Sequence, residues 1–212
     1  MIANIPRMPH EGAVADRSVP RYQREASLPF LCVPACLNMI CVRRGYPAVP
    51  QTDIAKRLGL VIPRRLTETY GFADVSDDPS RWGVRADTSE SGICRFLGDC
   101  TPPLYHVFTR WQEVPMSSQL DFIAAHIEKG NDIAVGFYAS GVYDGAGSVG
   151  HLALIDAIDT RSEMVRLIDP EVGADGGVTV NWSRLFDGIM AAHDGYWLFG
   201  NNAALLAPEF AS

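Results

Sequence analysis

The sequence has no long apolar segment. Its hydrophobic stretches are interrupted by Gly, Asp or Arg before they reach the roughly twenty residues that a membrane helix needs. The N-terminus also lacks the charged start and continuous apolar core of a secretory signal. We therefore expect a soluble, cytoplasmic protein.

Basic charge is scarce as well. The chain has 18 Lys and Arg against 25 Asp and Glu, for a formal net charge of −7, and no basic run is longer than two arginines. Such an acidic field repels nucleic acids and anionic membrane surfaces. The charge balance argues against both kinds of partner and leaves a peptide or protein substrate open.

The cysteines do not indicate a disulfide framework. They are odd in number and scattered through a chain of 212 residues, at Cys32, Cys36, Cys41, Cys94 and Cys100. The first three are four and five residues apart, without the paired histidines that would complete a tetrahedral metal site. No glycine pattern typical of a nucleotide site precedes a helix. We expect free thiols, no metal and no cofactor.

Hydrophobic residues make up 47% and charged residues 20% of the sequence, which is typical of a globular protein. Residues 1–27 show no sustained periodicity and are interpreted as an N-terminal arm that packs across the body, and residues 28–212 as a single domain. Helices are predicted over 34–44, from 52 or 53 to 59, and from 117 or 118 to 130.

The second half of the sequence changes to a strand-like pattern that lasts almost to the end of the chain. Short β-branched or aromatic runs separated by turn residues predict strands at 132–138, 151–158, 163–168, 177–180 and 194–199. Residues 61–101 are predicted to be mainly loops, with one short helix around 93–97. A helix-rich first half and a strand-rich second half predict an α+β protein with a cleft between the halves.

Three residues in this pattern suggest nucleophilic catalysis. Cys32 lies just before or on the first turn of the 34–44 helix, where free backbone N–H groups and a partial positive charge stabilise a thiolate. His151 begins an apolar strand after a glycine-containing loop, a position suited to a general base. Asp169 ends the next strand and would meet His151 if the two strands pair as a hairpin. An early Cys and a late His fit a cysteine-nucleophile enzyme.

The same segments resemble a known family. LCVPACLNMI, residues 31–40, resembles the Asp-Cys-Gly-Pro-Ala-x-Leu-x-Met motif of bacteriocin-processing cysteine peptidases, which remove leader peptides after a double glycine. GHLALIDAID and VRLIDPEVG, residues 150–159 and 165–173, are similar to that family's Gly-His and Asp-Pro strands. The resemblance implies a papain-like fold, a Cys32, His151 and Asp169 triad, and a stand-alone peptidase.

The chain departs from the family pattern near the nucleophile. Leu31 and Val33 replace the family's aspartate and glycine on either side of the cysteine. The family's oxyanion-stabilising glutamine stands six residues before the cysteine, where this chain has Ala26. Gln23, nine residues before Cys32, is the candidate for that role, with the backbone N–H of Cys32 as the second donor.

Each candidate residue also has a competing interpretation. Cys32 could be a small buried hydrophobe and Asp169 a turn residue before Pro170. Cys36 is a rival nucleophile, but it lies one helical turn further along and away from the free N–H groups. His106 is a competing base, but no Asp-Pro element follows it at hairpin distance.

Three functions are therefore consistent with the sequence. The first is a cysteine peptidase that acts on a leader or precursor peptide through an acyl-enzyme intermediate. The second is an acyltransferase, since papain-like sites also pass an acyl group to an amine. The third is a catalytically silent peptide-binding module, which the apolar Leu31 and Val33 and the displaced Gln23 favour.

Overall fold

A six-stranded antiparallel sheet forms the centre of the computed structural model, which describes residues 21–84, 92–144, 150–173, 177–202 and 206. The sheet has the strand order β3-β8-β4-β5-β6-β7. In that order its strands are β3 (Tyr105–Arg110), β8 (Gly195–Gly200), β4 (Asp132–Tyr138), β5 (Gly150–Asp159), β6 (Met164–Ile168) and β7 (Val178–Asn181). All five neighbouring pairs run antiparallel.

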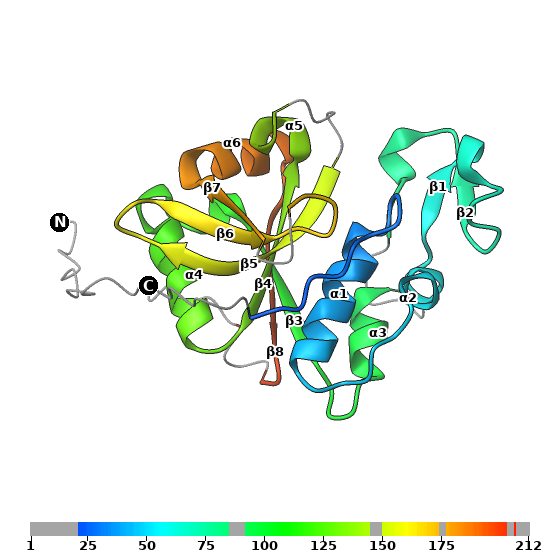
Figure 1. The fold of residues 1–212 in the computed structure, drawn as a ribbon, viewed down its shortest axis with the longest axis horizontal. Coiled ribbons are helices and arrows are strands. Elements are labelled where there is room, and N and C mark those ends of the chain that lie inside the picture. Colours follow the sequence, from blue (N-terminus) through cyan, green and yellow to red (C-terminus); the bar gives the residue numbers. More distant parts are fainter. Residues whose placement is uncertain (1–20, 85–91, 145–149, 174–176, 203–205, 207–212) are drawn as a thin grey trace.

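Helices cover both faces of the sheet (Figure 1). One face packs against α1 (Cys32–Arg43), α2 (Gln51–Arg57) and α3 (Ile93–Gly98). The other packs against α4 (Gln119–Glu128), α5 (Ala139–Val142) and α6 (Trp182–Ala192). Short 3₁₀ helices lie in the connections at Arg64–Leu66, Pro79–Arg81, Trp111–Glu113 and Met116–Ser118. Among the described residues, no helix is both long and apolar enough to cross a membrane.

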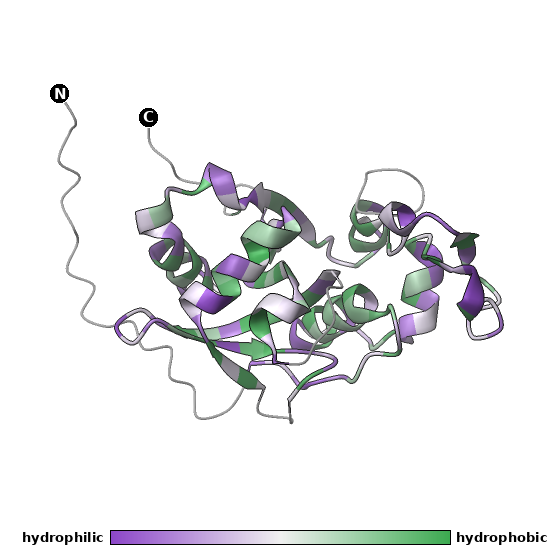
Figure 2. Cartoon of the chain, turned by 90° about the horizontal axis from the view of Figure 1, so that it is seen from above, coloured by the Kyte–Doolittle hydropathy of each residue, from purple (hydrophilic) through white to green (hydrophobic). Residues whose placement is uncertain are grey.

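Alternation along the central strands sends side chains to the two helical layers in turn. In β4, Ala134 packs in the cluster with α1, α2 and α3, whereas Val135 packs in the cluster with α4 and α6. In β5, Leu154 and Ile155 divide in the same way. Figure 2 shows that hydrophobic residues, drawn in green, lie on the helices as well as on the strands. Burial of one such side chain contributes about 1.5–3 kcal/mol, so both layers are held mainly by the hydrophobic effect.

The predicted α+β fold class is confirmed, and most predicted elements match. The strand expected at 132–138 is β4, and the ends of the other four predicted strands lie within one residue of β5, β6, β7 and β8. The helix expected over 34–44 begins two residues earlier than predicted, so that Cys32 is its first residue.

Two features of the structure were not among the predicted elements. Residues 182–192 form the helix α6 instead of continuing the strand pattern, because Asn181 caps its N-terminus and Trp182, Leu185 and Ile189 form a buried stripe at helical spacing. Within the region assigned to loops, β1 (Val61–Pro63) and β2 (Asp74–Ser76) pair as a small parallel sheet. Strands of three residues are too short to show a periodicity.

The described part of the predicted arm, residues 21–27, packs across the body of the protein, while residues 1–20 lie outside the described residues. Tyr22 is buried, and its hydroxyl donates a hydrogen bond to Asp132 over 2.5 Å. At the other end of the segment, the backbone N–H of Ser27 donates to the carbonyl of Pro170 over 2.9 Å. The boundary predicted between residues 27 and 28 stays a prediction.

Asp132 attaches the C-terminal end of α1 to the sheet. Its carboxylate is fully buried at the start of β4 and forms ion pairs with Arg43, at 2.9 Å, and with Arg44. Arg21 lies 3.6 Å away, and the Tyr22 hydroxyl also donates to this carboxylate. Arg43 is the last residue of α1 and Arg44 is its C-cap, and a positive charge at this end of a helix also interacts favourably with the helix dipole.

We expect Asp132→Asn to lower the free energy of unfolding by about 3 kcal/mol or more, because it leaves several buried or half-buried guanidinium groups without their counter-charge. Urea denaturation at neutral pH measures this loss. The matched control is Asp121→Asn, an exposed residue in the first turn of α4, with an expected change below about 1 kcal/mol. Equal losses in the two variants would contradict the assignment.

Candidate active site

Cys32 occupies the first position of α1. Leu31 precedes it as the N-cap residue, and no side chain caps this end of the helix. Within the described part of the chain, the backbone N–H of Cys32 has no acceptor. Its thiol is half-buried. The thiol therefore lies beside an unpaired donor at the positive end of the helix dipole, where a thiolate is favoured.

His151 is the second residue of β5 and is almost completely buried. It pairs with Phe137 of β4, and the two rings meet edge to face with centroids 5.4 Å apart. The next residue, Leu152, accepts a hydrogen bond at its carbonyl from the Cys36 thiol over 3.5 Å. This contact places the start of β5 against the first turns of α1.

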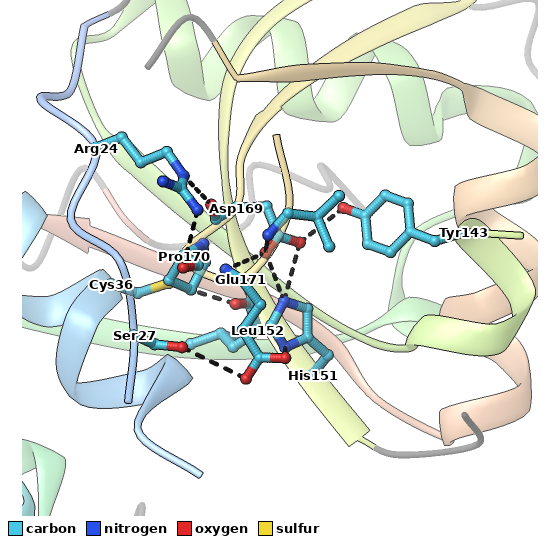
Figure 3. A network of polar contacts seen from close by, with 10 residues as sticks. Arg24, Ser27, Cys36, Tyr143, His151, Leu152, Asp169, Pro170 and Glu171 are labelled. Atoms are coloured by element: carbon cyan, nitrogen blue, oxygen red, sulfur yellow. Dashed lines mark hydrogen bonds and ion pairs between the residues drawn. The ribbon is translucent and has the colours of Figure 1, made fainter. Parts of the chain in front are cut away.

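Asp169 directly follows β6, where Ile168 pairs with Leu154 of β5. Its carboxylate is fully buried, and both oxygens lie 2.9 Å from Nε2 of His151 (Figure 3). The Tyr143 hydroxyl donates to Oδ2 over 2.7 Å. The backbone N–H groups of residues 171 and 172 donate to Oδ1 over 2.7 and 3.0 Å. A hydrogen-bond network therefore holds the carboxylate and the imidazole in one orientation.

The Cys32 thiol faces the remaining side of the imidazole. Because Nε2 is directed at Asp169, Nδ1 is the nitrogen left for the sulfur. A hydrogen bond with Cys32 and the charge of Cys32 are both among the causes that raise the pKa of His151, so the thiol lies within hydrogen-bond reach of the imidazole.

These contacts set the pKa values of the site. Burial by itself lowers the pKa of His151, but hydrogen bonding and charge from Asp169 and Cys32 outweigh it and raise the pKa to about 10. Burial raises the pKa of Asp169, but the hydrogen bond and charge of His151 and the Tyr143 hydroxyl outweigh it, and the pKa is lowered. The site therefore favours an imidazolium next to a carboxylate.

The chain was compared with known proteins at the level of sequence and of structure. No protein-family model matches the sequence, and no curated protein matches it. The fold, however, is similar to a crystal structure from Bacillus anthracis that is described as that of a proposed C39-like peptidase, with a TM-score of 0.55. The similarity covers 90% of this chain and 98% of the other at 14% sequence identity. At this identity the likeness establishes a C39-like fold.

Gln23, the sequence candidate for the oxyanion donor, is exposed. It lies between the buried Tyr22 and Arg24, whose guanidinium donates to the carbonyl of Asp169 over 2.8 Å. In the described part of the chain, no hydrogen bond joins Gln23 to Cys32 or His151. The oxyanion role of Gln23 stays a prediction that rests on its position in the sequence.

The two rival residues lie in different surroundings. Cys36 is fully buried, and burial, followed by the charge of Cys32, raises the pKa of its thiol well above the ordinary value. His106 of β3 stacks on Trp197 with ring centroids 5.6 Å apart, and its Nδ1 lies 3.7 Å from the Cys94 sulfur. Burial lowers the pKa of His106. This second thiol–imidazole pair joins α3 to β3, whereas Cys32 and His151 belong to α1 and β5.

Sequence reasoning missed two residues around the imidazole. Tyr143, in the loop before His151, donates to Asp169, and Glu171 follows the Asp-Pro pair with a carboxylate oxygen 3.9 Å from Nδ1 of His151. The Ser27 hydroxyl also donates to Glu171, over 3.4 Å. Tyr143 and Glu171 lie near the candidates His151 and Asp169 in the sequence, and that proximity is the only sequence signal for them.

All five cysteines are free thiols in the structure. Cys100, at the end of α3, is half-buried and has its pKa lowered to about 7 by a hydrogen bond with Cys41 of α1, against the raising effect of burial. A thiol with this pKa is partly ionised near neutral pH, and the thiolate is the form that reacts with alkylating reagents. Within the described residues, no three His, Cys, Asp or Glu side chains gather into a metal site.

We expect the imidazoles of His151 and His106 to titrate on opposite sides of their ordinary value of 6.5. A histidine NMR titration measures both, with His106→Gln and His151→Gln used for assignment. The pKa of His151 should lie at about 10 and fall in Asp169→Asn. The stabilisation from protonated His151 is then complete below pH 6.5 and is lost as the pH rises through about 10. A pKa of His151 below 6.5 would contradict this view of the site.

Proposed function

We propose that this chain is a cysteine peptidase in which Cys32 is the nucleophile, His151 the general base and acid, and Asp169 the residue that orients His151. The supporting observation is the imidazole held on Asp169 at 2.9 Å, with its other side turned to the thiol at the start of α1. This arrangement matches the chemical requirement of a nucleophile, a base and a group that orients the base.

The proposed reaction begins with attack of the Cys32 thiolate on the carbonyl carbon of a peptide bond. His151 then gives its proton to the leaving amine, and a thioester remains on Cys32. A water molecule, deprotonated by His151, hydrolyses the thioester and releases the acid product. The unpaired N–H of Cys32 donates to the oxyanion, and Gln23 is proposed as the second donor from its sequence position.

The proposed substrate is a precursor peptide with small residues at the scissile bond. The resemblance of residues 31–40 and 150–173 to leader-removing peptidases supports this choice. The C39-like description of the structural neighbour agrees with a peptide substrate. The negative charge of the chain also makes a peptide a better partner than a nucleic acid.

A peptide-binding module without activity is the second candidate. The exposed Gln23, which has no contact with Cys32, favours it, because a peptidase needs donors directed at the oxyanion. Leu31 supports it as well, since this fully buried residue stands where the family has an aspartate. Kinetic measurements on variants distinguish the two candidates.

We expect Cys32→Ala and His151→Ala to abolish cleavage of a double-glycine peptide almost equally, while Asp169→Asn leaves a measurable remainder of kcat/KM. The reason is that the third residue orients the proton carrier without carrying the proton. Chromatography of the cleavage products measures the rates, and circular dichroism checks folding. Cys100→Ser is the matched control and should keep full activity. Unchanged turnover in Cys32→Ala would rule out the peptidase mechanism.

We expect Gln23→Ala to lower turnover by about a hundredfold while alkylation of Cys32 by iodoacetamide keeps its rate. Alkylation needs only the thiolate, whereas acyl transfer builds negative charge on the carbonyl oxygen. Peptide mapping measures the labelling of Cys32, and a Cys100→Ser background removes the competing product at Cys100. Unchanged turnover in Gln23→Ala would show that Gln23 is not an oxyanion donor.

A further inference from the structure

Asp194 is a partly buried carboxylate that has no cationic partner among the described residues. It lies directly before β8, and its Oδ1 accepts a hydrogen bond from the Gly195 backbone over 2.9 Å. Within the described part of the chain, it forms no ion pair with Lys, Arg or His. Burial raises its pKa, and the hydrogen bond from Gly195 only partly offsets this effect. Removing a carboxylate from water without a counter-charge costs free energy, so the position calls for an explanation.

The carboxylate covers Gly136, in the middle of β4. A Cβ at position 136 would lie 2.1 Å from Oδ2 of Asp194, so any larger residue there would displace the carboxylate. Gly136 alternates with Val135 and Phe137, which pack toward α4 and α6, and therefore faces the α1 side of the sheet. Asp194 thus lies on the same face of the sheet as α1.

This position is close to the proposed nucleophile. Gly136 pairs with Leu152, whose carbonyl accepts from the Cys36 thiol, and Cys36 is one helical turn after Cys32. Strands β8, β4 and β5 are neighbours (Figure 1), and neighbouring strands lie about 4.8 Å apart. The start of β8 is therefore roughly 10 Å from the start of β5, which an extended peptide spans with about three residues.

Aromatic side chains line the same face beside the carboxylate. Trp197 is half-buried, and its indole N–H lies near enough to lower the pKa of Asp194, without the geometry of a full hydrogen bond. The Phe108 ring lies 4.8 Å from the Trp197 ring and is 37% exposed. Arg110 of β3 pairs with Gly195 of β8, but the Arg110 side chain is exposed and forms no ion pair with Asp194. A carboxylate beside aromatic rings is chemistry that binds a cation.

We propose that Asp194 and Trp197 form a subsite for a lysine or arginine side chain of the peptide substrate, within about three residues of the scissile bond. The proposal rests on the proposed function, because it takes Cys32 as the place where the peptide is cleaved. A bound ammonium or guanidinium group supplies the missing counter-charge and lies against the indole ring. Asp194 thus acts on substrate choice and not on bond cleavage.

The test measures binding in a Cys32→Ala background, where no peptide is consumed. The probes are fluorescent ten-residue peptides with a central Gly-Gly and a Lys, Ala or Glu placed in turn at each of three positions on either side. Fluorescence anisotropy gives the Kd values. At one position the Lys peptide should bind about tenfold more tightly than the Ala peptide. Adding Asp194→Asn should reduce this preference below about twofold and leave the Kd of the Ala peptide unchanged.

The asparagine keeps an oxygen for the Gly195 N–H, so the variant preserves the local fold. Asp187→Asn removes the same charge from the exposed side of α6 and should keep the preference. Equal affinities for Lys and Ala at every position, no measurable binding by any peptide, or a preference that survives Asp194→Asn would each overturn the subsite. Cleavage is assayed separately with Cys32 intact: a preference for Lys without cleavage overturns the peptidase proposal and leaves the subsite standing.

Discussion

The carboxylate of Asp169 has no access to water, and a buried charge is stable only where other groups replace its hydration. Three sources provide this replacement: the imidazole of His151, the hydroxyl of Tyr143 and the backbone N–H groups of residues 171 and 172. These partners come from β5, the segment before it and the turn after β6. One desolvated charge therefore orders the whole end of the sheet on which the proposed chemistry depends.

The position of α1 follows from contacts at both of its ends. At its C-terminal end, Arg43 and Arg44 form ion pairs with the buried Asp132 at the start of β4. At its N-terminal end, Cys32 faces His151, near the end of β4 that is remote from Asp132. A helix held in this way cannot slide along the sheet without breaking a buried ion pair. The distance between thiol and imidazole is therefore a property of the whole α1–sheet packing and not of a local loop.

The segment formed by residues 21–28 joins α1 and α2 to the sheet. Tyr22 contacts Asp132, Arg24 contacts the carbonyl of Asp169, and Ser27 contacts Pro170. Glu25 accepts hydrogen bonds from Asn38 of α1 and from Gln51 of α2. The same segment carries Gln23, so its fixed path limits which donors can reach the sulfur.

Local patterns were sufficient for much of the fold. The strand β4 has the predicted ends, since β-branched and aromatic runs bounded by turn residues carry a strong signal. The placement of Cys32 at the start of α1 also follows from the local sequence, through Pro34 near the start of the helix and Gly45 after its end. Helix α6 lies between two predicted strands, in a segment for which no element was predicted, although Trp182, Leu185 and Ile189 have helical spacing.

Tertiary structure decided the geometry of the site. The register of β5 and β6 shifts by one residue between Ile155 and Ala157, and only this shift sets Asp169 level with Ala153, on the face that His151 also uses. The sequence does not mark such a bulge, because its position depends on contacts between strands. The same holds for Asp194, which reaches Gly136 only across the sheet. The sequence by itself determined which residues stand at helix and strand ends, and the pairing of the strands decided which of those ends meet, since contacts between distant residues carry no local signal.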